Sequence, residues 1–369
     1  MNLYHYAVVV GINRYPGGYK LLRGPVADAR AFATWLTGSN KGGLPRENVS
    51  LMLTPRPYPR KLDEASPLKG RIDSALWSAH KSLRARLDAA PEDQRSALRD
   101  QSRIYLFVAG HGVMPQGGDS ALLDAEAEPG RQTNLGLDKY LDWFRRDGQF
   151  AEVCILADCC RGYDLLAEPG APGFARAARA PGDVSYLFAL STSAGQLAFE
   201  DKATDAEQYR GHFSRALMQG LAGEATDPDT GELTGDRLIA YARRIVAERT
   251  KALGPGREQS VPPPHTSGTL TFGPTRKAAG AARDGERTPP PGRTKRKVRI
   301  VFPDGFTGRV ELVAPDASTE LWDTADGPLT RWLYDGTWYV QHEGTDMDTK
   351  GFAADGLFTV SGEDCDVQL

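Results

Sequence analysis

Two short apolar runs that each end abruptly in reactive side chains constrain this chain more than any other feature. The first run is VCILA at residues 153–157, and it is followed at once by Asp158, Cys159, Cys160 and Arg161. A continuous apolar run of this length is typical of a parallel strand that is covered on both faces. In open α/β sheets, catalytic and ligand-binding groups lie just beyond the carboxyl ends of the strands. The run therefore predicts a buried strand with a thiol placed for chemistry at its end.

The second run is IYLFV at residues 104–108, and it leads directly into Ala109-Gly110-His111-Gly112. A histidine thus also stands at the end of a predicted strand. His111 and Cys160 are 49 positions apart, which leaves room for a crossover helix between two parallel strands of one sheet. Because the carboxyl ends of parallel strands meet at one edge of a sheet, we expect these two residues to be neighbours.

The rest of the first 273 residues predicts further strands and helices of the same α/β kind. Apolar residues at helical spacing predict a helix after Gly24-Pro25, and others over 71–90, 137–144, 213–221 and 238–249. Further strands are predicted over 6–12, 49–54, 184–190 and 268–272. His80 has no evident partner in the sequence, and we expect it at the protein surface or at its boundary.

Five motifs give the chain a resemblance to a known family. They are YAVVVGINRY at 6–15, LLRGPVADA at 21–29, VAGHG at 108–112, DCCRG at 158–162 and GHFSRALMQGL at 211–221. Each motif alone is weak evidence, but five motifs that follow one family's order and spacings are specific evidence. Over roughly residues 4–273 the chain resembles the caspase-like cysteine peptidases, in the metacaspase or prokaryotic caspase branch. The resemblance implies an α/β fold with a caspase-like, mostly parallel sheet flanked by helices.

The resemblance implies that Cys160 and His111 form a catalytic dyad. A thiolate is a strong nucleophile, and a nearby imidazole can lower the pKa of a thiol, so this pair suits attack on a peptide carbonyl. The backbone N–H groups of Gly112 and Cys160 would hold the developing oxyanion. Taken singly, Cys160 could instead be a buried cysteine at a strand end, and His111 a turn residue.

Either of two adjacent cysteines could supply the nucleophile. The family pattern, which is Asp, a small residue and then the nucleophile, selects Cys160. Successive side chains along a strand point to opposite faces. We therefore expect Cys159 to be packed in the core and Cys160 to be the reactive thiol.

The resemblance also implies which residues select the substrate. In similar metacaspases, the acid two positions before the nucleophile and an acid in the first loop motif form a pocket for Arg or Lys. These positions are Asp158 and Asp28 here. Paired carboxylates favour a cation, and they can hold a guanidinium group bidentately. Asp28 could instead be an acid favoured by the dipole at a helix N-terminus.

The motifs predict no metal or cofactor, with calcium as the one open case. Calcium-activated metacaspases carry several acids in loops near the site, and Asp119, Asp124 and Asp164 are available here at spacings that match poorly. A Cys/His metal site is disfavoured, because the cysteines are adjacent instead of in a CxxC pair and no second pair exists.

The composition limits the kind of protein. The 369 residues carry a net charge of −3, which predicts no general affinity for nucleic acid or for anionic membranes. No apolar run approaches the ~18–20 residues that span a bilayer, and the N-terminus is predicted to be the first strand instead of a signal peptide. Four cysteines without a disulfide pattern predict a cytoplasmic protein.

Changes in composition divide the chain into three predicted parts. A peptidase domain at 1–273 is followed by a linker at 274–297, which lacks bulky apolar residues and is rich in Pro, Gly, Arg and Lys. Alternating apolar residues such as Val298 and Ile300, together with Asp-Gly turn signals, predict a small all-β domain of sandwich type at 298–369.

Together these features predict a cysteine endopeptidase that cleaves proteins or peptides after Arg or Lys and is switched on by proteolysis. The segment 163–183 contains Arg176 and Arg179 among small residues, where the protein itself or an upstream protease could cut. The linker offers similar sites at Arg283, Arg287 and Arg293. The resemblance also suggests a role in prokaryotic stress or antiviral defence. The alternative is a non-catalytic binding or scaffold protein on a caspase-like fold.

Overall fold

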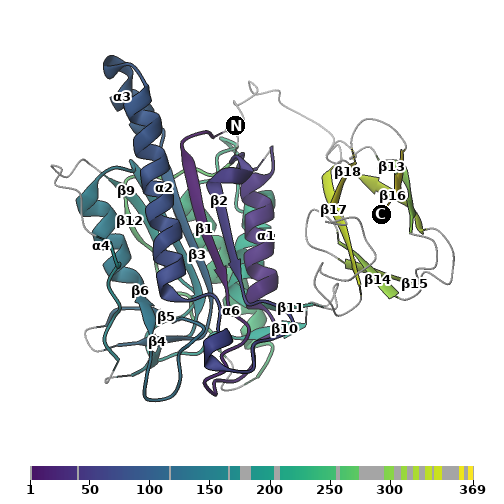
Figure 1. Ribbon diagram of the computed structural model, residues 1–369, viewed down its shortest axis with the longest axis horizontal. Coiled ribbons are helices and arrows are strands. Elements are labelled where there is room, and N and C mark those ends of the chain that lie inside the picture. The colour runs from purple at the N-terminus through teal and green to yellow at the C-terminus, as the bar shows by residue number, and fades with distance from the viewer. Residues whose placement is uncertain are drawn as a thin grey trace. The chain divides into compact units, whose positions relative to one another are not determined.

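The computed structural model resolves the chain into two compact units, and Figure 1 labels their helices and strands. The first unit holds the described residues up to Gly273, and the second holds those from Lys295 onward. The described residues are 2–39, 41–115, 118–164, 167–174, 184–202, 208–254, 258–273, 295–302, 309–313, 319–323, 329–334, 336–342, 357–360 and 365–368.

A six-stranded sheet forms the centre of the first unit. Its spatial order is β12-β9-β7-β3-β1-β2, and all neighbouring strands pair in parallel except β12, which runs antiparallel to β9. The strands are β1 (His5–Gly11), β2 (Val49–Leu53), β3 (Arg103–Gly110), β7 (Glu152–Cys159), β9 (Ser185–Leu190) and β12 (His265–Ser267). The predicted strands over 104–108 and 153–157 are thus the two neighbours β3 and β7.

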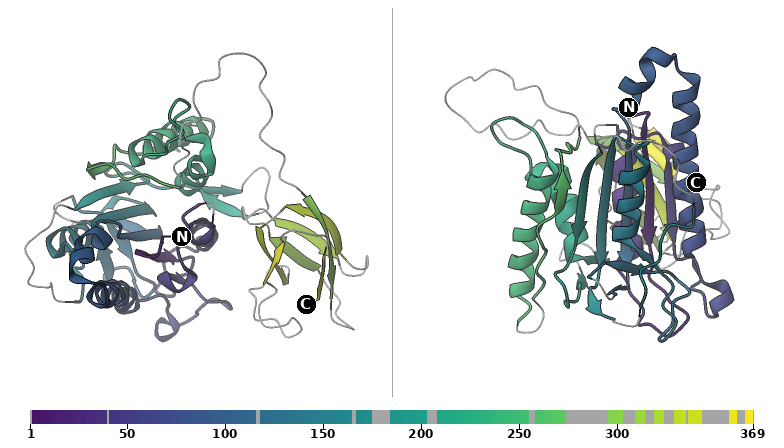
Figure 2. Two further views of the ribbon diagram at one scale, coloured as in Figure 1. Left: turned by 90° about the horizontal axis from the view of Figure 1, so that it is seen from above. Right: turned by 90° about the vertical axis from the view of Figure 1, so that its left-hand side faces the viewer.

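Helices cover both faces of this sheet, which Figure 2 shows as the middle layer. One face packs against α2 (Lys69–Ala89) and α4 (Leu137–Asp147), and the other against α1 (Pro25–Thr37), α5 (His212–Gln219) and α6 (Gly235–Lys251). Alternate residues of each strand enter the two cores: Val8 and Val10 face α2, and Ala7 and Val9 face α1. Full burial of an apolar side chain of this size contributes about 1.5–3 kcal/mol, so continuous apolar strands suit this three-layer arrangement.

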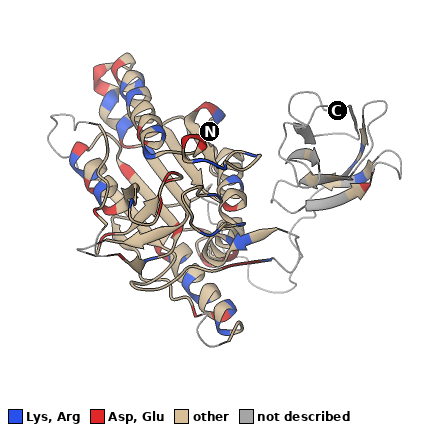
Figure 3. Ribbon diagram, turned by 60° about the horizontal axis from the view of Figure 1, so that its bottom comes forward, with Lys and Arg blue, Asp and Glu red and all other residues tan. Residues whose placement is uncertain are grey.

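The helices leave both signs of charge on the outside of the unit. Figure 3 shows Lys, Arg, Asp and Glu mixed along α2 and α3 (Glu92–Arg99). Within the described part of the chain, no helix is long and apolar enough to cross a membrane.

Two small groups of strands stand beside the carboxyl ends of the central strands. A four-stranded sheet has the order β6-β5-β4-β8 and consists of β4 (Gly112–Met114), β5 (Ala121–Leu123), β6 (Asn134–Gly136) and β8 (Gly162–Tyr163). The antiparallel pair β10 (Glu200–Lys202) and β11 (Tyr209–Gly211) precedes α5. These short strands were not predicted, because segments of two or three residues carry no readable alternation.

The predicted strand over 268–272 is wrong. Leu270 and Phe272 are buried among the helices of the α1 face, which explains their alternation, but they form no strand of the sheet. The edge strand is instead β12, His265–Ser267, whose three residues are exposed. The alternation of apolar residues in this segment therefore reflects their burial and does not indicate pairing in the sheet.

The expectation that His80 lies at the surface or its boundary is also wrong. Its side chain is buried in α2, where Nε2 lies 2.9 Å from a carboxylate oxygen of buried Asp147 at the end of α4. Trp77 stacks on the imidazole at 4.9 Å. A charged partner 67 positions away in the sequence therefore allows this histidine to be buried.

The second unit consists of strands in two small sheets. One sheet has the order β16-β13-β19 and the other β15-β14-β17-β18. The strands are β13 (Lys295–Val301), β14 (Arg309–Val313), β15 (Thr319–Asp323), β16 (Leu329–Tyr334), β17 (Gly336–His342), β18 (Leu357–Val360) and β19 (Cys365–Gln368). Val298, Ile300, Val310, Leu312 and Val340 are buried, as their alternation predicts. The predicted linker over 274–297 lies outside the described residues up to position 294.

Candidate active site

The register between β3 and β7 brings His111 and Cys160 to the same level of the sheet. Ala109 pairs with Asp158 and Gly110 pairs with Cys159, so His111 and Cys160 are the next residues on two neighbouring parallel strands. The strands are buried along their whole length apart from the first residue of β7, which fixes their register. The expected meeting of these two residues at one sheet edge is therefore observed.

Two tyrosines and a backbone carbonyl orient His111. The imidazole Nε2 lies 2.7 Å from the carbonyl oxygen of Lys20, to which it donates as Nε2–H. The backbone N–H of His111 donates to the hydroxyl of Tyr15 at 2.8 Å, and the ring of Tyr15 lies 4.9 Å from the imidazole, with Tyr19 at 5.5 Å. Because Nε2 carries the proton in this hydrogen bond, Nδ1 of the neutral ring is left as the proton acceptor.

The imidazole is held in its neutral form. Burial lowers the pKa of His111 below its usual 6.5, and the hydrogen bond to the Lys20 carbonyl and the charge of Glu200 only partly oppose this. Near neutral pH the ring is therefore ready to accept a proton and not to donate one.

The thiol of Cys160 contacts the backbone of Ala198. The N–H of Ala198 donates to Sγ at 3.3 Å, and Sγ lies 3.8 Å from the Ala198 carbonyl oxygen. Burial raises the pKa of the Cys160 thiol above its usual 9, with the charges of Asp158 and Glu200 adding to the effect. The resting site therefore holds a neutral thiol beside a neutral imidazole.

The neighbouring thiol of Cys159 is packed in the core. Cys159 is 2% exposed, and it belongs to the cluster on the α2 face. Burial raises the pKa of its thiol well above the usual 9. Cys160 is half-buried and has the more accessible thiol of the two.

Gly112 lies against the backbone of the two cysteines. A Cβ atom at position 112 would stand 2.5 Å from the carbonyl oxygen of Cys160 and 2.8 Å from the side chain of Cys159. Any larger residue here would push the strands apart. The role of the Gly112 and Cys160 N–H groups as oxyanion donors stays a prediction, and the close approach of the two backbones is compatible with it.

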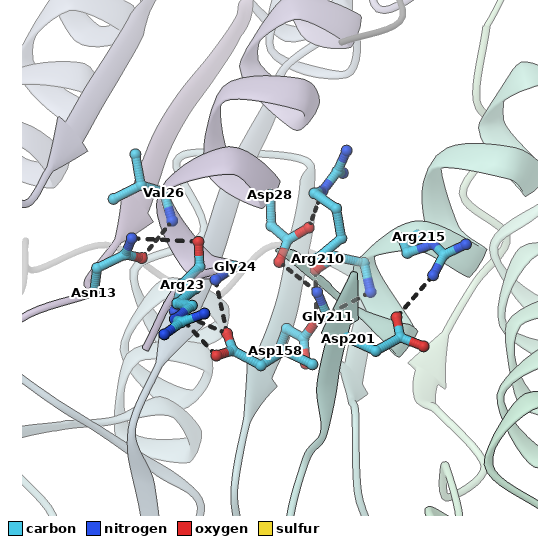
Figure 4. A network of polar contacts seen from close by, with 12 residues as sticks. Asn13, Arg23, Gly24, Val26, Asp28, Asp158, Asp201, Arg210, Gly211 and Arg215 are labelled. Carbon is cyan, nitrogen blue, oxygen red and sulfur yellow. Dashed lines mark hydrogen bonds and ion pairs between the residues drawn. The ribbon is translucent and has the colours of Figure 1, made fainter. Parts of the chain in front are cut away.

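Asp28 and Asp158 lie together beside Gly211, as Figure 4 shows. A Cβ atom on Gly211 would stand 2.2 Å from an oxygen of Asp158 and 3.3 Å from an oxygen of Asp28. Both aspartates are buried. Desolvation raises both carboxyl pKa values, that of Asp28 to about 7, and Asp158 adds a repulsive charge to Asp28.

Both aspartates already have partners within the protein. Asp28 accepts from Nε of Arg210 on one oxygen and from the N–H of Gly211, at 2.9 Å, on the other. Asp158 accepts from the N–H of Ser214 at 3.0 Å and from its hydroxyl at 2.6 Å. Asp28 lies in the first turn of α1, so the helix dipole also acts on it. The two proposed readings of Asp28, pocket acid and helix-start acid, are compatible.

Sequence reasoning missed several residues of this region. Gly211 and Ser214 lie in a recognised motif that Arg210 directly precedes, but the contacts of these residues with the two aspartates could not be read from the sequence. Tyr15 stands at the end of another recognised motif. Glu200 lies in a segment without any signal, and its carboxylate accepts from the N–H groups of Arg23 and Gly24 at 2.7–3.1 Å.

The three acids considered for calcium are engaged separately. Asp119 pairs with Lys139 at 3.3 Å, buried Asp124 accepts from the N–H of Lys69 at 2.9 Å, and Asp164 accepts from the side chain of Gln132. No group of three or more His, Cys, Asp or Glu suited to a metal occurs in the part of the chain that the structure describes. These residues therefore do not fit a calcium site, and no step of the chemistry is assigned to calcium.

The predicted processing sites lie beyond what the structure describes. The described residues do not include Arg176 and Arg179. They also do not include the linker sites Arg283, Arg287 and Arg293. The segment 163–183 is described at 163–164 and again from 167 as far as Phe174, whose ring packs at 4.6 Å from Trp143 and 5.7 Å from Trp77. The N–H of Gly173 donates to Asp73 at 3.1 Å. The described end of this segment is thus anchored to α2 and α4.

Comparison with known proteins identifies the family. A probable protease of a Desulfuromonadales bacterium is 26% identical over 236 residues, which are 59% of this chain and 26% of that protein, so the chain matches about a quarter of that relative's length. Caspase-1 of Spodoptera frugiperda has 15% identity and a TM-score of 0.43, covering 72% of this chain and 86% of that one. A protein of Geobacter sulfurreducens has 16% identity and a TM-score of 0.42, covering 72% and 94%. The family model of the caspase domain (Peptidase_C14) matches residues 4–270, and this chain therefore belongs to the caspase-domain family of peptidases.

Proposed function

We propose that this protein is a cysteine endopeptidase that cleaves after Arg or Lys through His111 and Cys160. The observation that carries the proposal is the register of β3 and β7, in which the two residues follow the paired residues Gly110 and Cys159. A thiol and a neutral imidazole at one sheet edge are the groups that acyl transfer needs.

The proposed reaction starts from the neutral pair. Nδ1 of His111 accepts the thiol proton as Sγ of Cys160 forms its bond to the substrate carbonyl carbon. The N–H groups of Gly112 and Cys160 hold the negative oxygen of the tetrahedral intermediate. The imidazolium then gives its proton to the leaving amine, and water, deprotonated by the same imidazole, releases the acyl group from Sγ.

The charges around Gly211 support a cationic residue at the cleaved position. Asp28 and Asp158 bring two carboxylates to the region, and Arg210 is their one close basic partner among the described residues. The excess of negative charge favours an Arg or Lys side chain over an acidic one. The pocket would admit the substrate cation beside the Asp28–Arg210 pair and not in place of Arg210.

Proteolytic activation is proposed for the segment between Phe174 and β9. A cut after Arg176 or Arg179 would separate the anchored Phe174 from the strand that begins at Ser185. The freed ends could then rearrange around the substrate site, which is an order–disorder type of switch. The same proposal includes protein or peptide substrates with Arg or Lys at the cleaved position and no required cofactor. It also places the protein in the cytoplasm, with a role in prokaryotic stress or antiviral defence.

A panel of fluorogenic peptides that differ only in Arg, Lys or Asp at the cleaved position tests the proposed function. We expect turnover of the Arg and Lys peptides, and none when Cys160 is replaced by Ala. Turnover of the Asp peptide alone would overturn the specificity. Absence of turnover in both the intact and the processed protein would favour the alternative, a binding or scaffold protein.

A further inference from the structure

Residues 167–174, which we call the strap, lie against β6, α2 and α4 in the manner of a bound peptide. The sequence of the strap is AEPGAPGF. Positions 169, 170, 172 and 174 are half-buried, whereas positions 168, 171 and 173 are exposed. The strap therefore turns one side to the protein and the other to solvent. Its two prolines restrict the backbone in advance, which lowers the entropy cost of ordering the strap.

Buried Asn134 of β6 holds the first half of the strap through its backbone. Its Nδ2 donates to the carbonyl of Glu168 at 2.9 Å, and its Oδ1 accepts from the N–H of Gly170 at 2.9 Å. The N–H of Gly136 donates to the carbonyl of Gly170 at 2.9 Å. A Cβ atom on Gly170 would stand 2.1 Å from the carbonyl oxygen of Asn134, so this approach requires glycine. Because β6 is the edge of its sheet, these contacts resemble the recognition of a peptide by strand addition.

An acid and two aromatic rings hold the other end of the strap. The N–H of Gly173 donates to buried Asp73 at 3.1 Å, and a Cβ atom on Gly173 would stand 2.8 Å from the same carboxylate oxygen. The ring of Phe174 packs edge-on at 4.6 Å from Trp143 and is stacked at 5.7 Å from Trp77. Backbone hydrogen bonds combined with an aromatic anchor are typical of a peptide-binding groove.

Hydrogen bonds connect this groove to His111 in two steps. Asn134 pairs with Leu123 across β6 and β5. The N–H of Leu123 donates to the carbonyl of His111 at 2.9 Å. The carbonyl of Leu123 accepts from the hydroxyl of Tyr15 at 3.4 Å, and the same hydroxyl accepts from the N–H of His111 at 2.8 Å. Leu123 therefore holds the backbone of His111 directly and also through Tyr15.

The strap leaves part of its surroundings open. A cavity of about 640 Å³ borders on it, and the lining includes Lys69 and Asn134 on the groove side and Glu168 and Gly170 on the strap side. The contact between Asn134 and the strap thus lies at the wall of a space that a second peptide can enter.

We propose that the groove formed by β6, α2 and α4 is a peptide-docking site with the strap as its occupant, and that its occupancy positions His111 through Asn134 and Leu123. The site recognises an extended peptide rich in Pro and Gly, with glycine at two contact points and an aromatic side chain at the end. Asn134 and Leu123 are positioning residues that touch no substrate. The inference rests on the proposed function only for its activity measurement.

The test empties the groove by changing the strap alone. Gly170→Val combined with Phe174→Ala introduces a clash with the backbone of Asn134 and removes the aromatic anchor, while every groove residue stays. A fluorescein-labelled peptide AEPGAPGF should bind this double variant at least about 10-fold more tightly than the wild type, because the tethered strap of the wild type competes at a high effective concentration. A peptide with Val and Ala at the same two positions should not bind.

Activity provides the second measurement. The double variant should lose roughly 10-fold in kcat for an Arg peptide with little change in KM, because a misplaced base slows the chemical step without weakening substrate binding. Saturating AEPGAPGF should restore kcat, a rescue that a general loss of stability would not show. Ala171→Ser is the matched control: position 171 is exposed, so this variant should behave as the wild type in both measurements. If the double variant does not fold, Phe174→Ala alone serves, with a smaller gain in peptide affinity.

The outcomes separate this inference from the proposed function. Failure of the peptide to bind the double variant, or equal binding to the wild type, would overturn the docking site. An unchanged kcat, or a lowered kcat that bound peptide does not restore, would overturn the positioning of His111. Binding is measured without substrate, so a wild type that cleaves none of the test peptides sinks only the proposed function. In that case the NMR resonance of the His111 ring replaces kcat: it should shift in the double variant and return when the peptide binds.

Discussion

The guanidinium of Arg210 donates from Nε to Asp28, so one of the two predicted pocket acids is already paired with a basic residue of its own chain. Both side chains are buried, and the second oxygen of Asp28 is occupied by the N–H of Gly211. Both oxygens of Asp28 are therefore occupied, and a substrate cation would be attracted only by the part of the Asp28 charge that Arg210 does not neutralise. In the proposed pocket, Asp28 would thus hold Arg210 in place as well as add negative charge.

The first prediction concerns the stability of this pair. Asp28→Ala leaves the buried guanidinium of Arg210 without a counter-ion, so it should lower the free energy of unfolding by about 3–5 kcal/mol, as loss of one partner of a buried ion pair does. Asp28→Ala combined with Arg210→Met should recover a large part of this loss. Urea unfolding of the four variants of the cycle measures the coupling. Additive effects of the two substitutions would contradict the importance of the pair.

The second prediction concerns the resting protonation of the dyad. Burial raises the pKa of the Cys160 thiol and lowers that of His111, so the thiolate–imidazolium form is disfavoured at neutral pH. Alkylation of Cys160 by iodoacetamide should therefore be slow at pH 7 and should rise steadily as the pH passes above 9. The measurement follows the modified peptide by mass spectrometry. A plateau in the alkylation rate already at pH 5–6 would show a preformed ion pair instead.

The third prediction concerns the pH dependence of activity, which should distinguish protonation of Asp28 from protonation of His111. Because burial raises the pKa of Asp28 to about 7, the pocket loses negative charge as the pH falls through 7. Because the pKa of His111 lies below 6.5, the base becomes protonated only at lower pH. The kcat/KM for an Arg peptide should hence fall as the pH drops through 7, and that for a citrulline peptide only below 6.5. Superimposable profiles for the two peptides would argue that Asp28 does not affect the substrate charge.

The fourth prediction concerns activation. Phe174 is anchored between Trp77 and Trp143, and β9 begins at Ser185, so a cut at Arg176 or Arg179 falls between two fixed points of the chain. Arg176→Ala combined with Arg179→Ala should keep the chain intact and reduce peptide turnover after activation. Gel analysis and turnover are followed together, with Arg283→Ala in the linker as the control. An uncut double variant with full activity would refute the switch and leave the peptidase assignment in place.

The sequence predicted the parts of the fold that depend on long apolar runs. The runs before His111 and Cys160 are β3 and β7, and their continuous apolar character made the two strands and their shared carboxyl edge predictable, whereas the register comes from the structure. The same reasoning failed at Leu270 and Phe272, where burial against helices imitates a strand. It failed at His80 because its partner Asp147 is remote in the sequence.

The surroundings of the proposed pocket could be predicted only in part for a related reason. Asp28 and Asp158 belong to recognisable motifs, but the partner Arg210 of Asp28 is 182 positions away. Glu200 comes from a three-residue strand, EDK, which has no apolar pattern. Contacts made by such short polar strands depend on tertiary pairing, here of Glu200 with Gly211, that no local pattern encodes.

Covalent labelling tests the central claim most directly. A peptide that carries Arg followed by an acyloxymethyl ketone reacts with a nucleophilic cysteine held at the substrate carbonyl position, and mass spectrometry locates the modified residue. The account predicts one label on Cys160, competed by an Arg peptide, retained in Cys159→Ala and lost in both Cys160→Ala and His111→Ala. A label on Cys159, or stronger labelling by the corresponding Asp reagent, would contradict it.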